Sequence, residues 1–211
     1  MKELIIVGAG GFGRELLQWC KDINCITPKW VIKGFLDDNL DALNGIDCNI
    51  NIVGNIKDWQ PSANEEFALG IAEPNTKEKV VAILENKGAN FISIIHPKAD
   101  IGDFNKIGKG VVVYPNARIT VNAHIGNFTS ILDLTTIGHD SSVGDFSTIC
   151  GGCGVNGHVN IEDHVFVGSH VTFVPGIKVG ANAYIGAGSV VIRNVRDGYK
   201  VFGNPAKKVE F

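Results

Sequence analysis

A six-residue repeat of large apolar side chains runs through the second half of the chain without a slip. In a chain that is 45% hydrophobic, such a series would arise by chance on the order of 10⁻⁶. A helix repeats about every 3.6 residues and a strand about every 2, so neither explains a period of six. The pattern fits a β-helix, in which short strands and turns coil around one core. The anchor positions are Ile101, Ile107, Val113, Ile119, Ile125, Ile131, Ile137, Val143, Ile149, Val155, Ile161, Val167, Phe173, Val179, Ile185 and Val191.

Small residues flank these anchors. The residue two before an anchor is usually small, as at Ser141, and a glycine often follows the anchor, as at Gly138. Large side chains fill the coil, and small ones let its corners turn tightly. Three hexapeptides form one triangular coil, so residues eighteen apart stack on one another. The span from Ile101 to Val191 predicts about five coils, ~24 Å tall at ~4.8 Å per layer. Because no long loop leaves the coil, an active site is expected on its faces or between subunits.

The first half of the chain alternates strands with helices. An apolar strand at 4–7 leads into a glycine loop and a helix over 14–21, and a second strand ends at 35–36. A third apolar run at 67–72 is followed by a helical stretch through residue 84, and 91–95 reads as a last strand. This order predicts a small doubly wound, Rossmann-like α/β domain over 1–96, followed by the coil over 97–211.

The glycine loop matches a dinucleotide-binding fingerprint. Gly8, Gly10 and Gly13 lie between the first strand and its helix, where backbone N–H groups and the helix N-terminus can face a pyrophosphate. The alternative is that these glycines only permit a tight turn and close helix packing. Asp37 and Asp38 follow the second strand, where a ribose or base contact is expected. They could equally be solvated turn residues.

His139 is the best catalytic candidate in the coil. It lies two residues after an anchor, at a turn, where its side chain should point outward. Gly157 stacks one coil above it and leaves space beside the imidazole. Asp140 could orient the ring and stabilise its protonated form, as carboxylates do for general-base histidines. The alternative is a solvated surface histidine.

The other histidines and the cysteines do not predict a metal site. His158, His164 and His170 recur every six residues, which places them on three different sides of the coil. Cys150 and Cys153 form a lone CxxC without a second pair, and the repeat places Cys153 inside the coil. We therefore expect no metal.

Composition narrows the partners and the compartment. The formal net charge is −3 and the charges are mixed, which offers no basic stripe for nucleic acid. No stretch approaches the roughly 18 apolar residues of a membrane span. Residues 1–11 lack the features of a signal peptide, and the five cysteines are scattered. A cytoplasmic protein is expected.

Together these segments resemble a known family. The sequence GAGGFG at 8–13, FLDD at 35–38, the uninterrupted coil, IGHDSSVGDFS at 137–147 and the closing VFGNPAK at 201–207 are similar to the hexapeptide-repeat acyltransferases. The resemblance is to the bacterial subgroup of nucleotide-amino-sugar N-acetyltransferases and sialic acid O-acetyltransferases. It implies a left-handed parallel β-helix, an exception to the right-handed crossover rule. It also implies a homotrimer with active sites between subunits, acetyl-CoA lying along the coil, and a role in polysaccharide biosynthesis.

The resemblance assigns roles to individual residues, which fall into three groups. His139 matches the general base and Asp140 its neighbouring acid. Contacts to the sugar nucleotide fall on Gly10, Gly11, Phe12, Asp37, Asp38 and Ala72, where Ala72 replaces a common glycine. Contacts to acetyl-CoA fall on Thr148, Ser169 and Ala187. Thr148 stands where some relatives carry His, so a second imidazole contact to the cofactor is absent.

The expected reaction is acetyl transfer to the amine of a nucleotide-linked 4-amino sugar within a ternary complex, with His139 as the base. Two alternatives stay open. One is O-acetylation of a sugar or sialic acid by the same base. The other, more distant, is a trimeric metal-dependent lyase on the same coil, which would explain neither the glycine loop nor the closing GNPAK.

Overall fold

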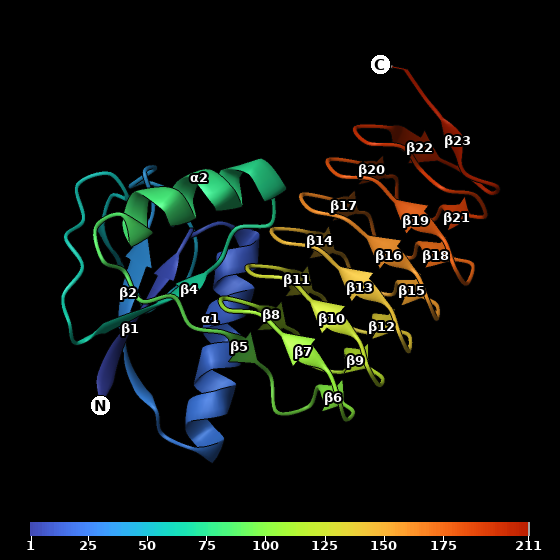
Figure 1. Ribbon diagram of the computed structural model, residues 1–211. Helices are drawn as coiled ribbons and strands as arrows, with labels where there is room; N and C mark the ends of the chain where they lie inside the picture. Colours follow the sequence, from blue (N-terminus) through green and yellow to red (C-terminus); the bar gives the residue numbers. More distant parts are fainter. Residues whose placement is uncertain (211) are drawn as a thin grey trace. The chain divides into compact units, whose positions relative to one another are not determined.

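The computed structural model describes residues 1–210, and the chain separates into two compact units, Met1–His96 and Pro97–Phe211. The first unit is built on a four-stranded sheet in the order β3-β2-β1-β4, in which every neighbouring pair is parallel. Figure 1 labels β1, β2 and β4 of this sheet together with the two helices of the unit. The elements are β1 (Lys2–Val7), α1 (Gly11–Ile26), β2 (Trp30–Leu36), β3 (Ile52–Gly54), β4 (Glu65–Leu69), α2 (Pro74–Glu85) and β5 (Ile94–Ile95).

Strand β1 lies at the centre of this sheet and is buried along most of its length. Leu4, Ile5, Ile6 and Val7 are all fully buried, which is typical of a parallel strand covered on both faces. Helix α1 connects β1 to β2, and α2 follows β4. The expected α/β fold of this half is confirmed.

The element boundaries differ from the expected ones in three places. Helix α1 is longer than 14–21, because its buried positions continue at helical spacing through Cys20 and Ile23. Strand β4 ends at Leu69, so 70–72 is a loop. The predicted strand at 91–95 is reduced to β5, and Phe91 forms only an isolated bridge to Phe67.

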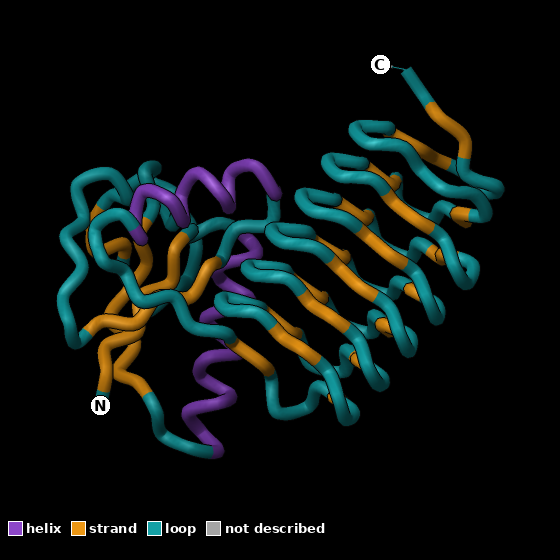
Figure 2. The backbone as a smooth tube through the Cα atoms, viewed as in Figure 1, coloured by secondary structure: helices purple, strands orange, loops and turns teal. Residues whose placement is uncertain are grey.

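The second unit is a left-handed parallel β-helix of two-residue strands joined by tight turns, as expected (Figure 2). Strands eighteen residues apart pair in parallel register, so the coil has three flat faces. On the first face the order is β6 (Asp100–Ile101), β9 (Arg118–Ile119), β12 (Thr136–Ile137), β15 (Gly154–Val155), β18 (Thr172–Phe173) and β21 (Val190–Val191). The second face holds β7 (Lys106–Ile107), β10 (His124–Ile125), β13 (Ser142–Val143), β16 (Asn160–Ile161) and β19 (Lys178–Val179). The third holds β8 (Val112–Val113), β11 (Ser130–Ile131), β14 (Thr148–Ile149), β17 (Phe166–Val167), β20 (Tyr184–Ile185), β22 (Lys200–Phe202) and the antiparallel β23 (Lys207–Lys208).

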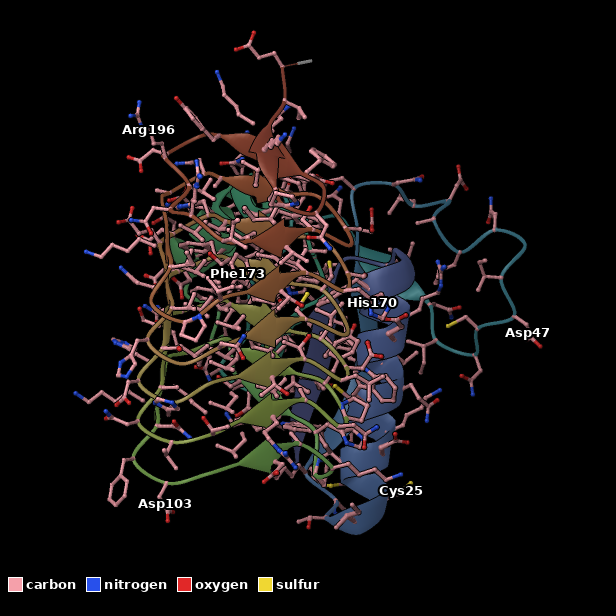
Figure 3. All side chains as sticks on the ribbon, turned by 90° about the vertical axis from the view of Figure 1, so that its right-hand side faces the viewer. Cys25, Asp47, Asp103, His170, Phe173 and Arg196 are labelled. Carbon is pink, nitrogen blue, oxygen red and sulfur yellow. The ribbon has the colours of Figure 1, made fainter. Side chains whose placement is uncertain are left out.

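The repeat anchors form the core of the coil. Anchors such as Ile137, Ile149 and Phe173 are fully buried (Figure 3 labels Phe173), whereas Ile101 and Ile107, where the coil begins, are only partly buried. Each coil contacts only its neighbours, so the first anchors have fewer apolar partners.

Buried hydroxyls on the inner wall connect successive coils. The side chains of Thr135, Ser141 and Ser147 donate to carbonyl oxygens fifteen residues further on, at 2.8, 2.8 and 3.0 Å. Ser141 also accepts from the backbone N–H of Val159 at 3.1 Å. Because these hydroxyls are paired, the small polar residues of the repeat cost little when buried.

The corners turn through the left-handed backbone region. Non-glycine residues with φ between 55° and 63° recur there every six residues, with glycines at some of the same positions. Asn122, Asp140 and His158 occupy one such corner on successive coils. Among the described residues, no helix is both long and apolar enough to cross a membrane.

Candidate functional site

His139 and Asp140 form a hydrogen-bonded pair at the corner between β12 and β13. His139 Nδ1 lies 2.7 Å from Oδ2 of Asp140. A carboxylate only accepts hydrogen bonds, so in the neutral ring Nδ1 carries the proton and Nε2 keeps its lone pair. The imidazole is therefore oriented with an available base at Nε2.

Asn122, one coil below, holds the other oxygen of this carboxylate. Its amide nitrogen donates to Oδ1 of Asp140 at 2.6 Å. The hydrogen bonds from His139 and then Asn122 lower the pKa of Asp140 below its usual range. Asp140 thus stays charged beside the imidazole, and a charged carboxylate stabilises the imidazolium that forms when the ring accepts a proton.

Space for the imidazole comes from Gly157, one coil above. A β-carbon at this position would lie only 2.5 Å from His139 Nε2. The side chain of His139 is nevertheless 57% exposed, so another molecule can reach it. The expected position of Gly157 beside the ring is confirmed.

His158 lies beside the same pair. Its ring centroid is 5.0 Å from that of His139, in an edge-on arrangement, and its Nε2 lies 3.8 Å from Oδ2 of Asp140. The spacing between histidines does place His158, His164 and His170 on different corners. That reasoning did not note that His158 and Asp140 are eighteen residues apart and therefore stack on neighbouring layers. The same spacing places Asn122 next to Asp140 on the layer below.

These three side chains could hold a metal ion. One ligand atom each of His139, Asp140 and His158 lies within 4.8 Å of the other two, and all three residues are exposed.

The first unit contains a pocket of about 410 Å³ beside the glycine loop. This volume is typical of a small-molecule site. All six residues expected to contact a sugar nucleotide line it: Gly10, Gly11, Phe12, Asp37, Asp38 and Ala72. Five further residues that sequence reasoning did not single out also line it, namely Ile56, Gly70, Ile71, Thr76 and Val80. They are ordinary apolar or polar residues of loops and of α2, and no motif marks them.

The glycines of this loop divide into two kinds. A β-carbon on Gly13 would overlap the carbonyl oxygen of Gly8, and Gly8 itself has φ +100° and lies against Gly70. These positions need glycine for packing. Gly10 and Gly11, in contrast, have no atom within 4 Å of where a β-carbon would be. The packing interpretation is therefore confirmed for Gly8 and Gly13, whereas Gly10 and Gly11 border open space and their contact with a pyrophosphate stays a prediction.

The N-terminus of α1 is open toward an anion. Its N-cap is Gly10, which has no side chain to cap it, and no acidic residue lies in its first turn. Helix α2 differs, because the carboxylate of Glu73 accepts from the N–H groups of Asn75 and Thr76 at its N-terminus. The partial positive charge at a helix N-terminus favours a nearby negative charge.

Asp37 and Asp38 both accept backbone hydrogen bonds in the loops around the pocket, and Asp37 also accepts from the N–H of Asn39 at 2.8 Å. Asp37 accepts from the backbone N–H of Ala9 at 2.8 Å and fixes the start of the glycine loop. Asp38 accepts from the N–H of Ile56 through Oδ1 at 3.0 Å, and the residue is exposed. Asp37 is therefore partly a structural residue, and Asp38 is the more accessible of the two.

The residues expected to contact acetyl-CoA lie on the coil in two places. Ser169 and Ala187 lie on successive layers of one corner, where Ser169 is partly buried and Ala187 is exposed. Thr148 is a buried residue of β14, between Ser130 and Phe166 on the same face.

Comparison with known proteins agrees with this architecture. Residues 3–84 match the model of the PglD N-terminal domain, and residues 158–193 match that of the bacterial transferase hexapeptide. The chain is 32% identical to the GDP-perosamine N-acetyltransferase of Escherichia coli O157:H7, over 97% of this chain and 95% of that protein.

Two solved structures share the whole fold. WeeI from Acinetobacter baumannii AYE has 28% identity and a TM-score of 0.87, with 99% of this chain and 100% of that chain covered. The acetyltransferase domain of PglB from Neisseria gonorrhoeae FA1090, in complex with acetyl coenzyme A, has 23% identity and a TM-score of 0.88, with 99% of each chain covered. With an α/β unit, an uninterrupted coil and this full-length similarity, the chain belongs to the hexapeptide-repeat acetyltransferase family that includes GDP-perosamine N-acetyltransferase.

Proposed function

We propose that this protein transfers the acetyl group of acetyl-CoA to the amine of a nucleotide-linked 4-amino-deoxy sugar. The observation that carries the proposal is the His139–Asp140 hydrogen bond of 2.7 Å, which leaves Nε2 of an exposed imidazole as a base. Full-length similarity to an enzyme named for GDP-perosamine favours an amino sugar as the acceptor.

In the proposed reaction the free amine attacks the thioester carbonyl. The new C–N bond forms, the C–S bond breaks, and CoA leaves as the thiolate. His139 Nε2 accepts the proton that the amine loses, and the charged Asp140 stabilises the resulting imidazolium. The proton then passes to the departing thiolate, so no acyl-enzyme is needed.

The pocket of the first unit is assigned to the nucleotide diphosphate. Gly10 and Gly11 allow phosphate oxygens to approach the backbone at the uncapped N-terminus of α1. Phe12, Asp38 and Ala72 also line the pocket and would contact the rest of the nucleotide, and Asp37 shapes the loop.

Acetyl-CoA is assigned to the coil. Ser169 and Ala187 offer accessible positions at one corner. The side chain of Thr148 is fully buried, so we expect Thr148 to influence acetyl-CoA binding only by positioning its strand β14. We also infer a cytoplasmic homotrimer that serves polysaccharide biosynthesis, in which neighbouring coils enclose the cofactor.

A substrate panel tests the proposal. Purified protein is given acetyl-CoA with UDP-, dTDP- and GDP-linked 4-amino-6-deoxy sugars, with the matching 4-hydroxy sugars and with free sialic acid. Loss of the thioester absorbance and the mass of the product are measured. Acetylation of an amino sugar supports the proposal, and the preferred nucleotide identifies the substrate. Acetylation of hydroxyl acceptors alone would instead establish an O-acetyltransferase.

A further inference from the structure

Three potential metal ligands gather at one corner of the coil. His139 and Asp140 come from one layer and His158 from the next, and one ligand atom from each lies within 4.8 Å of the other two. Asp140 Oδ2 is central, at 2.7 Å from His139 Nδ1 and 3.8 Å from His158 Nε2. The stacking of coils eighteen residues apart creates this cluster.

We propose that this cluster binds a divalent transition-metal ion such as Zn²⁺, and that the bound ion inhibits the enzyme. Two imidazoles and one carboxylate form a ligand set suited to Zn²⁺, Co²⁺ or Ni²⁺ rather than to Mg²⁺ or Ca²⁺, which prefer oxygen ligands. A water molecule would complete a four-coordinate site.

Small side-chain rotations are enough to form the site. Ligand atoms around tetrahedral zinc lie roughly 3.3–3.5 Å apart at bond lengths of about 2.0–2.1 Å. The side chains of His139, Asp140 and His158 are 57%, 37% and 65% exposed, which leaves room on the solvent side for these rotations. Asn122 holds Oδ1 of Asp140 and leaves Oδ2 directed at the two rings.

An ion at this site removes the proposed base whichever nitrogen of His139 it takes. On Nε2 the ion occupies the lone pair that would accept the proton. On Nδ1 it forces the ring's proton onto Nε2, which then has no lone pair to offer. Metal binding and proton abstraction by His139 therefore exclude each other. The binding site itself is independent of the proposed function, whereas the inhibition rests on it.

The repeat provides a matched control. His158 and His164 occupy the same position of the hexapeptide, with φ of 60° and 57°, on different corners. Asn122 and Asn182 show that asparagine adopts this left-handed conformation in the same coil. His158→Asn should therefore preserve the backbone conformation of the corner while removing one metal ligand. His164→Asn makes the same substitution at a corner outside the cluster and serves as the control.

The experiment titrates full-length protein, with any affinity tag removed, with ZnCl₂ by calorimetry and with CoCl₂ by visible absorption. Wild type and His164→Asn are expected to bind one ion per chain. His158→Asn is expected to lose about tenfold or more in affinity. Equal affinity in all three proteins, or no binding in any, overturns the site.

Acetyl transfer is then followed by thioester absorbance, because the CoA thiol itself binds zinc. Each protein's rate with Zn²⁺ is divided by its own metal-free rate. Wild type and His164→Asn should be inhibited and recover with a chelator, while His158→Asn should resist at the same Zn²⁺ concentration. Binding without inhibition would confirm the site and refute inhibition through the base, and it would count against His139 in the proposed function.

Discussion

Residues at the corners of the coil have a left-handed backbone conformation, and two of them, Asp140 and Asn122, belong to the proposed catalytic site. Asp140 has φ 58° and Asn122 has φ 55°, in the left-handed region that short polar side chains tolerate best. The same conformation turns Asp140 back toward the ring of His139 in its own corner. The left-handed corner thus places a carboxylate and an imidazole from adjacent residues within hydrogen-bond distance.

Replacing His139 tests the base. His139→Ala should lower turnover by ~10²–10⁴, the usual contribution of a general base, while the melting temperature stays unchanged because the side chain is exposed. The loss should shrink as pH rises if the acceptor is an amine, since more amine then arrives deprotonated. Steady-state rates across pH on the preferred acceptor provide the measurement. A variant as active as wild type at neutral pH would show His139 to be a surface residue.

Asn122→Gly tests the support of Asp140. Glycine adopts a left-handed φ freely, so the corner should persist while one hydrogen bond to the carboxylate is lost. Turnover should fall between about twofold and tenfold, the range of a typical net hydrogen bond. Asn116→Gly, at the same repeat position on another corner, should have no effect.

The pKa of Asp140 offers a second readout of that contact. Its hydrogen bonds lower the pKa, so the ionised form and its contribution to stability persist above the ordinary titration range of the carboxyl and are lost as pH falls below it. Removing Asn122 should raise the midpoint, so that Asp140 protonates at a higher pH. A carboxyl-detected NMR titration of wild type and Asn122→Gly would reveal the difference, and identical midpoints would contradict the assigned role.

The glycine loop and the start of α1 contain two kinds of glycine, one that close packing requires and one that borders open space. Gly8 and Gly13 let the helix approach the strands, and Gly10 and Gly11 leave open space at the helix N-terminus. The element therefore combines packing with a surface that an anion can approach.

Two substitutions separate these roles. Gly11→Val should raise the KM for the nucleotide sugar and leave the KM for acetyl-CoA nearly unchanged, with little loss of stability. Gly13→Ala should instead destabilise the fold by about 1–3 kcal/mol, since its β-carbon would overlap Gly8. Thermal melts and steady-state kinetics on both variants provide the test. Equal damage to both KM values in Gly11→Val would mean that this position is structural.

The anchors of the coil differ in how much each contributes to the free energy of unfolding. Ile149 is fully buried between neighbouring layers, while Ile101 is only partly buried. Ile149→Ala should therefore cost about 2–5 kcal/mol, and Ile101→Ala clearly less. Urea unfolding of the two variants measures the difference, and equal costs would contradict a core whose packing weakens where the coil begins.

At the scale of the whole molecule, the flat faces of the coil favour self-association. The faces are repetitive and carry no long loop, and the proposed reaction needs the cofactor to be enclosed. We expect a stable homotrimer with parallel coils. Light scattering at micromolar concentration should give three times the mass of the 22.6 kDa chain. A monomeric mass under these conditions would refute the trimer and the shared cofactor site.

The sequence by itself determined the architecture. A period of six with apolar anchors allows only a coil, because no helix or single strand repeats at that interval. Strands alternating with helices in the first half likewise specified a parallel α/β fold. The resemblance carried by the motifs at 8–13, 35–38, 137–147 and 201–207 identified the acetyltransferase family, which the full-length similarity confirms.

Tertiary structure decided which side chains meet. Asn122, Asp140 and His158 stack at eighteen-residue intervals, and the structure adds the 2.6 Å hydrogen bond from Asn122 to Asp140 and the 3.8 Å distance from Asp140 to His158. The pocket of the first unit likewise draws Ile56, Thr76 and its other walls from separate loops and a helix. A sequence pattern records period and side-chain type, which fix the local backbone. The eighteen-residue spacing indicates which residues stack, but which side-chain atoms come within hydrogen-bond distance depends on the conformations that the side chains adopt in the folded coil.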